Sequence, residues 1–154
     1  MIDYKAPYKF LLHNLVVCPH CGKTMSAVFI PYEVNDNVIQ FPVGIYVCPD
    51  KCGEPFNAPQ LDQEVIDYIC KAFKTDSFKK AVLNYILEDE SEEHDVDENE
   101  AKQIADVTGF IGDNFNCLQP LDLLRWTNLL VESINLFTEP STDYLKSLSF
   151  NFRV

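Results

Sequence analysis

The first third of the chain has the pattern of β-strands. Residues 25–32 and 38–47 are rich in β-branched and aromatic side chains, which favour strands. Between them stands the triplet Asn-Asp-Asn at 35–37, which is typical of a turn. The pattern therefore predicts a β-hairpin, preceded by an apolar lead-in or strand over residues 10–17.

After residue 60 the apolar positions recur three and four residues apart, which is the helical period. Helices are predicted over residues 61–73, 77–88, 100–115 and 121–137. Residues 147–154 then alternate apolar and polar side chains, which predicts a closing strand able to pair with the hairpin region. We expect an α+β fold in one compact domain, with the hairpin part over 1–60 and a helical extension over 61–154.

Four of the six cysteines form two closely spaced pairs. Cys18 and Cys21 lie in a CxxCG motif, Cys48 and Cys52 lie in a CxxxCG motif, and 26 residues separate the pairs. Two such pairs suit one tetrahedral metal site, and a glycine after each pair permits a positive φ. Four thiolates favour a single structural Zn²⁺ and leave no open coordination position. With the hairpin between them, the pairs predict a four-cysteine zinc ribbon.

Other uses of the cysteines are less favoured. Two disulfides would suit an exported protein, but the N-terminus lacks the pattern of a secretory signal. An iron site of the rubredoxin type is disfavoured, because the extra residue in the second cysteine pair departs from the rubredoxin pattern. His20 could replace a cysteine ligand, although four thiols already fill the shell. Cys70 lies on an apolar helical stripe and is expected to be buried, and Cys117 has no assigned role.

The charge is concentrated in one segment. The chain has a net charge of −12, and residues 88–100 contain nine carboxylates with no Lys or Arg. Such a segment predicts a solvated, mobile linker, or else a surface for a basic partner or a decoy for DNA phosphates. The acidic balance disfavours a protein that holds DNA over a wide surface.

Sequence motifs for catalysis are missing. We find no glycine-rich phosphate loop, no HExxH and no GxSxG, and none of the three histidines lies in a recognisable catalytic context. We therefore expect no enzyme and no small-molecule substrate. No apolar run approaches the roughly 18 residues of a membrane span, so we expect a cytoplasmic protein without membrane contact.

The order of these features resembles the recombinase zinc-ribbon domain of large serine recombinases. In that family an L-x-x-L-x-x-C-x-x-C-G-x-x-M opening leads to an aromatic residue shortly before the third cysteine, and a fourth cysteine and a helix follow. The matching positions here are Leu12, Leu15, Cys18, Cys21, Gly22, Met25, Tyr46, Cys48 and Cys52. The resemblance is good over residues 11–73, loose over 120–154 and absent between them.

The resemblance implies a ribbon that follows a catalytic serine domain, helps to dock on attachment-site DNA and carries a coiled-coil arm controlling synapsis. This chain begins about ten residues before the resemblance, so we expect no catalytic serine. The region of the arm holds the second helix, the acidic segment and the third helix. From Thr24 to Val47 the hairpin has no Lys or Arg, so it lacks the cations that dominate DNA affinity.

We expect a non-catalytic accessory protein that acts through protein contacts with a recombinase or another DNA-bound protein. One alternative is the DNA-binding module of a split recombinase. Its candidate contacts to nucleic acid are Lys23, Lys71, Lys74, Lys79 and Lys80, although a solvated helix face explains the last four as well. The other alternative is an acidic DNA mimic or inhibitor, in which residues 88–100 occupy a basic site on a target protein.

Overall fold

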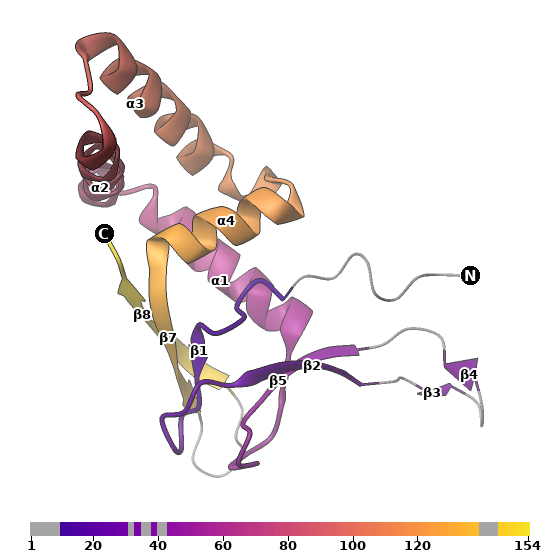
Figure 1. Ribbon diagram of the computed structural model, residues 1–154. Helices are drawn as coiled ribbons and strands as arrows, with labels where there is room; N and C mark the ends of the chain where they lie inside the picture. The colour runs from indigo at the N-terminus through magenta and orange to yellow at the C-terminus, as the bar shows by residue number, and fades with distance from the viewer. Residues whose placement is uncertain (1–9, 31–32, 35–37, 40–42, 139–144) are drawn as a thin grey trace. The chain divides into compact units, whose positions relative to one another are not determined.

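The computed structural model describes residues 10–30, 33–34, 38–39, 43–138 and 145–154, and it has the predicted α+β architecture (Figure 1). The chain forms two compact units. The first comprises the described residues up to 63 together with 124–153, and the second comprises residues 64–123. The first unit therefore combines the hairpin segment with residues 124–153, which are distant from it in the sequence.

The hairpin of the first unit forms as predicted. β2 (Ser26–Ile30) pairs antiparallel with β5 (Val43–Val47), with Ser26 opposite Val47 and Ile30 opposite Val43. β6 (Phe56–Asn57) pairs antiparallel with the other edge of β5. β3 (Glu33–Val34) and β4 (Val38–Ile39) form a separate two-stranded ladder. The expected turn at residues 35–37 lies outside the described residues.

A second sheet has the order β1-β7-β8. β1 (Val16–Val17) runs parallel to β7 (Val131–Thr138), and β8 (Leu145–Phe152) runs antiparallel to β7. The closing strand is thus present, and its partner is β7. The predicted helix over 121–137 is wrong beyond residue 130, because α4 (Pro120–Leu130) ends there and β7 begins. Pairing on both edges of β7 outweighs the helical spacing of its apolar residues.

A buried tyrosine joins three segments of the first unit. Tyr46 in β5 is 1% exposed, and its hydroxyl donates a hydrogen bond to Oδ1 of Asp62 at 2.6 Å. The same hydroxyl accepts the backbone N–H of Leu12 at 3.1 Å. Asp62 belongs to α1 (Ala58–Ala72). The position that carries the family resemblance just before the third cysteine is therefore a structural anchor between the hairpin, α1 and the lead-in segment.

The second unit consists of the rest of α1, α2 (Asp76–Glu93), α3 (Glu98–Asp113) and the short 3₁₀ helix η1 (Phe115–Cys117). Its core contains Phe73, Val82 and Phe115. The ring of Phe73 packs edge-on against Phe78, with centroids 5.0 Å apart, and lies 5.9 Å from the ring of Phe115. Gly112 approaches Phe73 so closely that an added Cβ would lie 2.7 Å from its ring.

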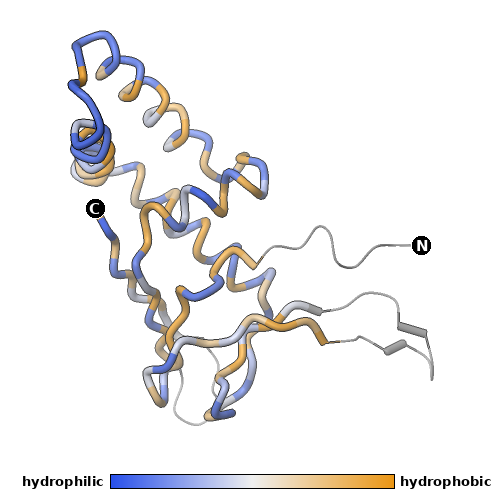
Figure 2. Tube along the Cα trace, in the orientation of Figure 1, coloured by the Kyte–Doolittle hydropathy of each residue, from blue (hydrophilic) through white to orange (hydrophobic). Residues whose placement is uncertain are grey.

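The acidic segment over 88–100 is mostly helical, which corrects the prediction of a mobile linker. α2 continues to Glu93 and α3 begins at Glu98, because glutamate is a good helix former. Asp97 caps α3 by accepting the N–H of Glu100 at 2.8 Å. The connection between α2 and α3 is strongly hydrophilic (Figure 2). None of the described helices is long and apolar enough to cross a bilayer.

Candidate metal centre

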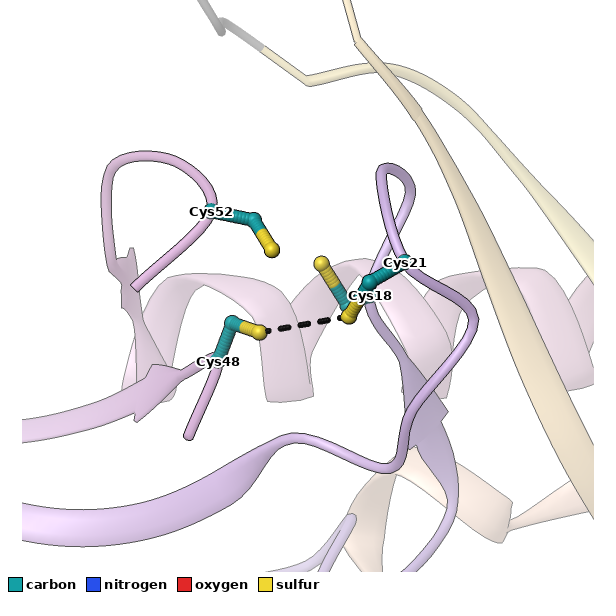
Figure 3. A group of neighbouring side chains, drawn as sticks. All are labelled: Cys18, Cys21, Cys48 and Cys52. Atoms are coloured by element: carbon teal, nitrogen blue, oxygen red, sulfur yellow. Dashed lines mark hydrogen bonds between the residues drawn. The ribbon is translucent and has the colours of Figure 1, made fainter. Parts of the chain in front are cut away.

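Four cysteine sulfurs meet at one end of the hairpin. Cys18 and Cys21 come from the loop after β1, and Cys48 and Cys52 come from the loop after β5 (Figure 3). Their Sγ atoms all lie within 4.8 Å of one another, and those of Cys21 and Cys48 are 3.5 Å apart. The fold thus brings together both cysteine pairs that the sequence singles out.

The first knuckle turns around a glycine, as expected. Gly22 has φ of +76°, a conformation that costs glycine little. Its N–H donates to the carbonyl of Cys18 at 3.1 Å, and the N–H of Cys18 donates to the carbonyl of Lys23 at 2.8 Å. These bonds fold the loop back on itself. The backbone N–H of His20 points at Sγ of Cys18 across 3.4 Å, so His20 contributes its backbone to the cluster.

The second knuckle achieves its turn by a different residue. Lys51, the additional residue of the CxxxCG motif, has φ of +55° and donates its N–H to the carbonyl of Cys48 at 2.9 Å. Among the described residues, Gly22 is the glycine with a positive φ. Gly53 therefore does not supply the positive φ that was expected after the second cysteine pair. The longer loop moves the left-handed position one place before the fourth cysteine.

The donor set fits a tetrahedral metal ion. With sulfur about 2.3 Å from zinc, each pair of sulfurs in a tetrahedron lies about 3.8 Å apart, which is compatible with the observed cluster. Cys18 and Cys48 are 3% and 2% exposed, whereas Cys21 and Cys52 face solvent. The cluster therefore has a buried side that is supported by the hairpin and an open side through which an ion can enter.

The electrostatics of the thiols also favour a cation. Backbone N–H groups of Cys52 and Asp50 lower the pKa of Cys48 to about 6. Hydrogen bonds to Cys21 and Cys48 raise the pKa of Cys52 to about 12, and burial raises the pKa of Cys18. The thiolate is thus favoured at Cys48 and disfavoured at Cys52 and Cys18 in the absence of a cation. Four thiolates need a cation among them at neutral pH.

The knuckles are also joined by an ion pair. Nζ of Lys23 lies 2.6 Å from Oδ2 of Asp50, and both side chains are about half exposed. Exposed pairs of this kind stabilise little, but this one connects the loop of the first knuckle to that of the second. Asp50 raises the pKa of Lys23. Lys23, the first of the five lysines predicted to contact nucleic acid, therefore forms an ion pair beside the cysteines.

The other four candidate lysines lie in the second unit. Lys71 is in the last turn of α1, Lys74 lies in the turn that follows it, and Lys79 and Lys80 are in the first turns of α2. All four side chains are exposed. Their contact with nucleic acid stays a prediction.

Sequence reasoning missed two supports of the centre. Lys51 carries no signal for a positive φ, because glycine is the residue that usually marks such a position. The bond between Tyr46 and Asp62 was also missed, since it joins residues 16 positions apart in the chain. Asp50, which follows Cys48 by two residues, is the signal from which the ion pair with Lys23 could have been predicted.

Comparison with known proteins identifies a shared fold. No protein-family profile matches the sequence, and no curated protein matches it. One solved structure, described as the crystal structure of an LSR–DNA complex, matches with a TM-score of 0.56 and 14% identity. LSR denotes a large serine recombinase. The match covers 98% of this chain and 58% of that chain, so this chain spans somewhat over half its length. The fold is therefore similar to part of a large serine recombinase, and the likeness extends across α2 and α3, where sequence resemblance is absent.

Proposed function

We propose that this chain is a non-catalytic zinc-ribbon module of DNA recombination, which acts through protein contacts with a recombinase or another DNA-bound protein. The fold likeness supports the relation to recombinases. The four clustered cysteines support one Zn²⁺ with a structural role, because four thiolates complete its shell. In this role the ion holds the two loops together, and no open coordination position is left for a substrate.

The surface of the hairpin is the observation that carries the preference for a protein partner. Val28, Phe29 and Ile30 in β2 are 38%, 40% and 42% exposed. Residues 24–47 contain no Lys or Arg, so the hairpin offers no counter-charge to phosphates. Exposed apolar side chains on both faces of a strand favour contact with another protein.

A second function, DNA binding, is favoured by a specific finding. The similar structure is described as a complex with DNA, and the match extends over almost the whole of this chain. Lys74, Lys79 and Lys80 of the second unit would then supply the phosphate contacts. This reading predicts a clear dependence of DNA affinity on salt.

Binding measurements on the zinc-loaded protein distinguish the two functions. We expect fluorescence anisotropy with labelled duplex DNA to show no binding at about 50 mM salt, where phosphate contacts are strong. A purified recombinase from the same genome is expected to bind, and Phe29→Asp should weaken that binding at least tenfold. Val107→Asp is the matched control, because Val107 is an exposed apolar residue of α3.

Two results would overturn the proposal. Micromolar DNA binding that weakens steeply with salt and is lost in Lys79→Gln would establish the second function instead. Recombinase binding that is unchanged by Phe29→Asp would remove the hairpin as the contact surface.

A further inference from the structure

Two adjoining cavities open between α2 and α3 in the second unit. The first has a volume of about 220 Å³ and is almost entirely apolar, with walls formed by Phe73, Leu83, Ala105 and Thr108. It is larger than the apolar cavity of about 150 Å³ that admits benzene in an engineered protein. It can therefore accommodate one aromatic ring or a short alkyl chain.

A glycine keeps this cavity open. Gly109 and Gly112 of α3 both line it, although glycine is unfavourable within a helix. Gly112 is explained by the close approach of Phe73. Gly109 has no such explanation, because an added Cβ there would have no neighbour within 4 Å and its φ is not positive. What its missing side chain provides is space.

Cations gather at the same place. Lys79 and Lys80 line the apolar cavity. The second cavity, of about 270 Å³, shares Phe73, Lys79 and Gly112 with the first and adds Lys74, Cys70, Asn116 and Asp113. Three of the twelve basic residues of an acidic chain therefore border the two cavities, two of them at the apolar one. Asp113 is an acid that lines the second cavity.

We propose that this pair of cavities binds a small amphipathic carboxylate. Its apolar body lies between Phe73 and Leu83, and its carboxylate lies against the ammonium groups of Lys79 and Lys80. An apolar pocket with a few convergent polar groups is the common form of a small-molecule site, and the lysines select a negative charge. The site is independent of the zinc centre and of the function proposed above.

Titration of the zinc-loaded full chain with octanoate tests this proposal. We expect one saturable site by calorimetry, with amide NMR shifts centred on Ala105, Thr108 and Gly109. Lys79→Gln/Lys80→Gln should weaken octanoate binding at least tenfold and leave the binding of neutral octanol unchanged. Lys102→Gln is the matched control, because Lys102 is exposed on α3 and does not line either cavity.

Filling the space provides the second arm of the test. Gly109→Leu should abolish octanoate binding while it preserves the helical circular dichroism, since leucine favours a helix more than glycine does. Leu83→Trp is the second filling variant, for use if the first alters the fold. The absence of saturable octanoate binding, or full binding by both filled variants, would overturn the proposal. Displacement of octanoate by inorganic phosphate alone would also overturn it, since it would show simple anion binding.

Discussion

Removal of one hydroxyl tests how the hairpin is held in the first unit. Tyr46→Phe keeps the ring but deletes the atom that donates to Asp62 at 2.6 Å and accepts the N–H of Leu12 at 3.1 Å. Tyr46 and Asp62 are both buried, so water cannot readily replace the lost bonds. The substitution should therefore loosen the hairpin, α1 and the lead-in segment together.

The expected magnitude follows from the partners. A hydrogen bond to a charged group contributes about 1.5–3 kcal/mol, and a buried polar group left unsatisfied costs about 1–3 kcal/mol. Partial rearrangement recovers some of this, because Asp62 is not completely enclosed. We expect Tyr46→Phe to lower the free energy of unfolding by about 2–4 kcal/mol.

Urea denaturation of the zinc-loaded protein measures the effect. Trp126, the single tryptophan, lies in the part of α4 that belongs to the first unit, so its fluorescence reports on the correct region. Tyr85→Phe is the matched control, because Tyr85 is a half-buried tyrosine of α2 outside the first unit, and it should change the stability of the first unit by less than about 0.5 kcal/mol. If Tyr46→Phe changes stability as little as this control, the three segments are held by apolar packing alone and our reasoning is refuted.

Three further predictions follow from other features. Zinc affinity, measured by competition with a chromophoric chelator, should fall as pH falls, because the raised pKa of Cys52 makes protons compete with the ion. Glu100 lies 2.8 Å from the His94 ring and raises the pKa of His94. The stabilisation of the α2–α3 connection by this pair is therefore complete below pH ~6.5 and is lost as pH rises through the raised pKa. His94→Gln should remove this pH dependence from thermal melts. Gly109→Ala should stabilise α3 by about 1 kcal/mol in urea titrations, whereas Gly112→Ala should destabilise it, because its methyl group would lie 2.7 Å from an aromatic ring.

Features with local causes were predictable from the sequence. The paired cysteines and the strand pattern between them predicted the hairpin and the cysteine cluster, because each loop brings two thiols to one place through contacts within a few residues. The stripe of Ile104, Thr108 and Ile111 likewise predicted α3, whereas Phe115, the last residue of that stripe, lies beyond the end of the helix in η1.

Features that depend on distant partners were not predictable. Residues 131–137 fit a helix by spacing, and they form a strand because β1 and β8 pair with its two edges. The register of β1 against β7 places Val16 opposite Ile134, and nothing near either residue in the sequence indicates this pairing. The acidic segment was misjudged for a different reason, since its charge suggested repulsion while its glutamates and the cap at Asp97 stabilised helices.

The parallel pairing of β1 with β7 also sets the order in which the chain can fold during synthesis. The second unit, residues 64–123, is complete in one stretch, whereas Val16 must wait until Ile134 has been made. At about 5–20 residues per second this delay lasts on the order of ten seconds. During that time Leu15 and Val16 lack their partner Ile134 in β7, so the nascent first unit is the part most exposed to aggregation. A metal ion bound early by the two knuckles would keep the hairpin closed until β7 arrives.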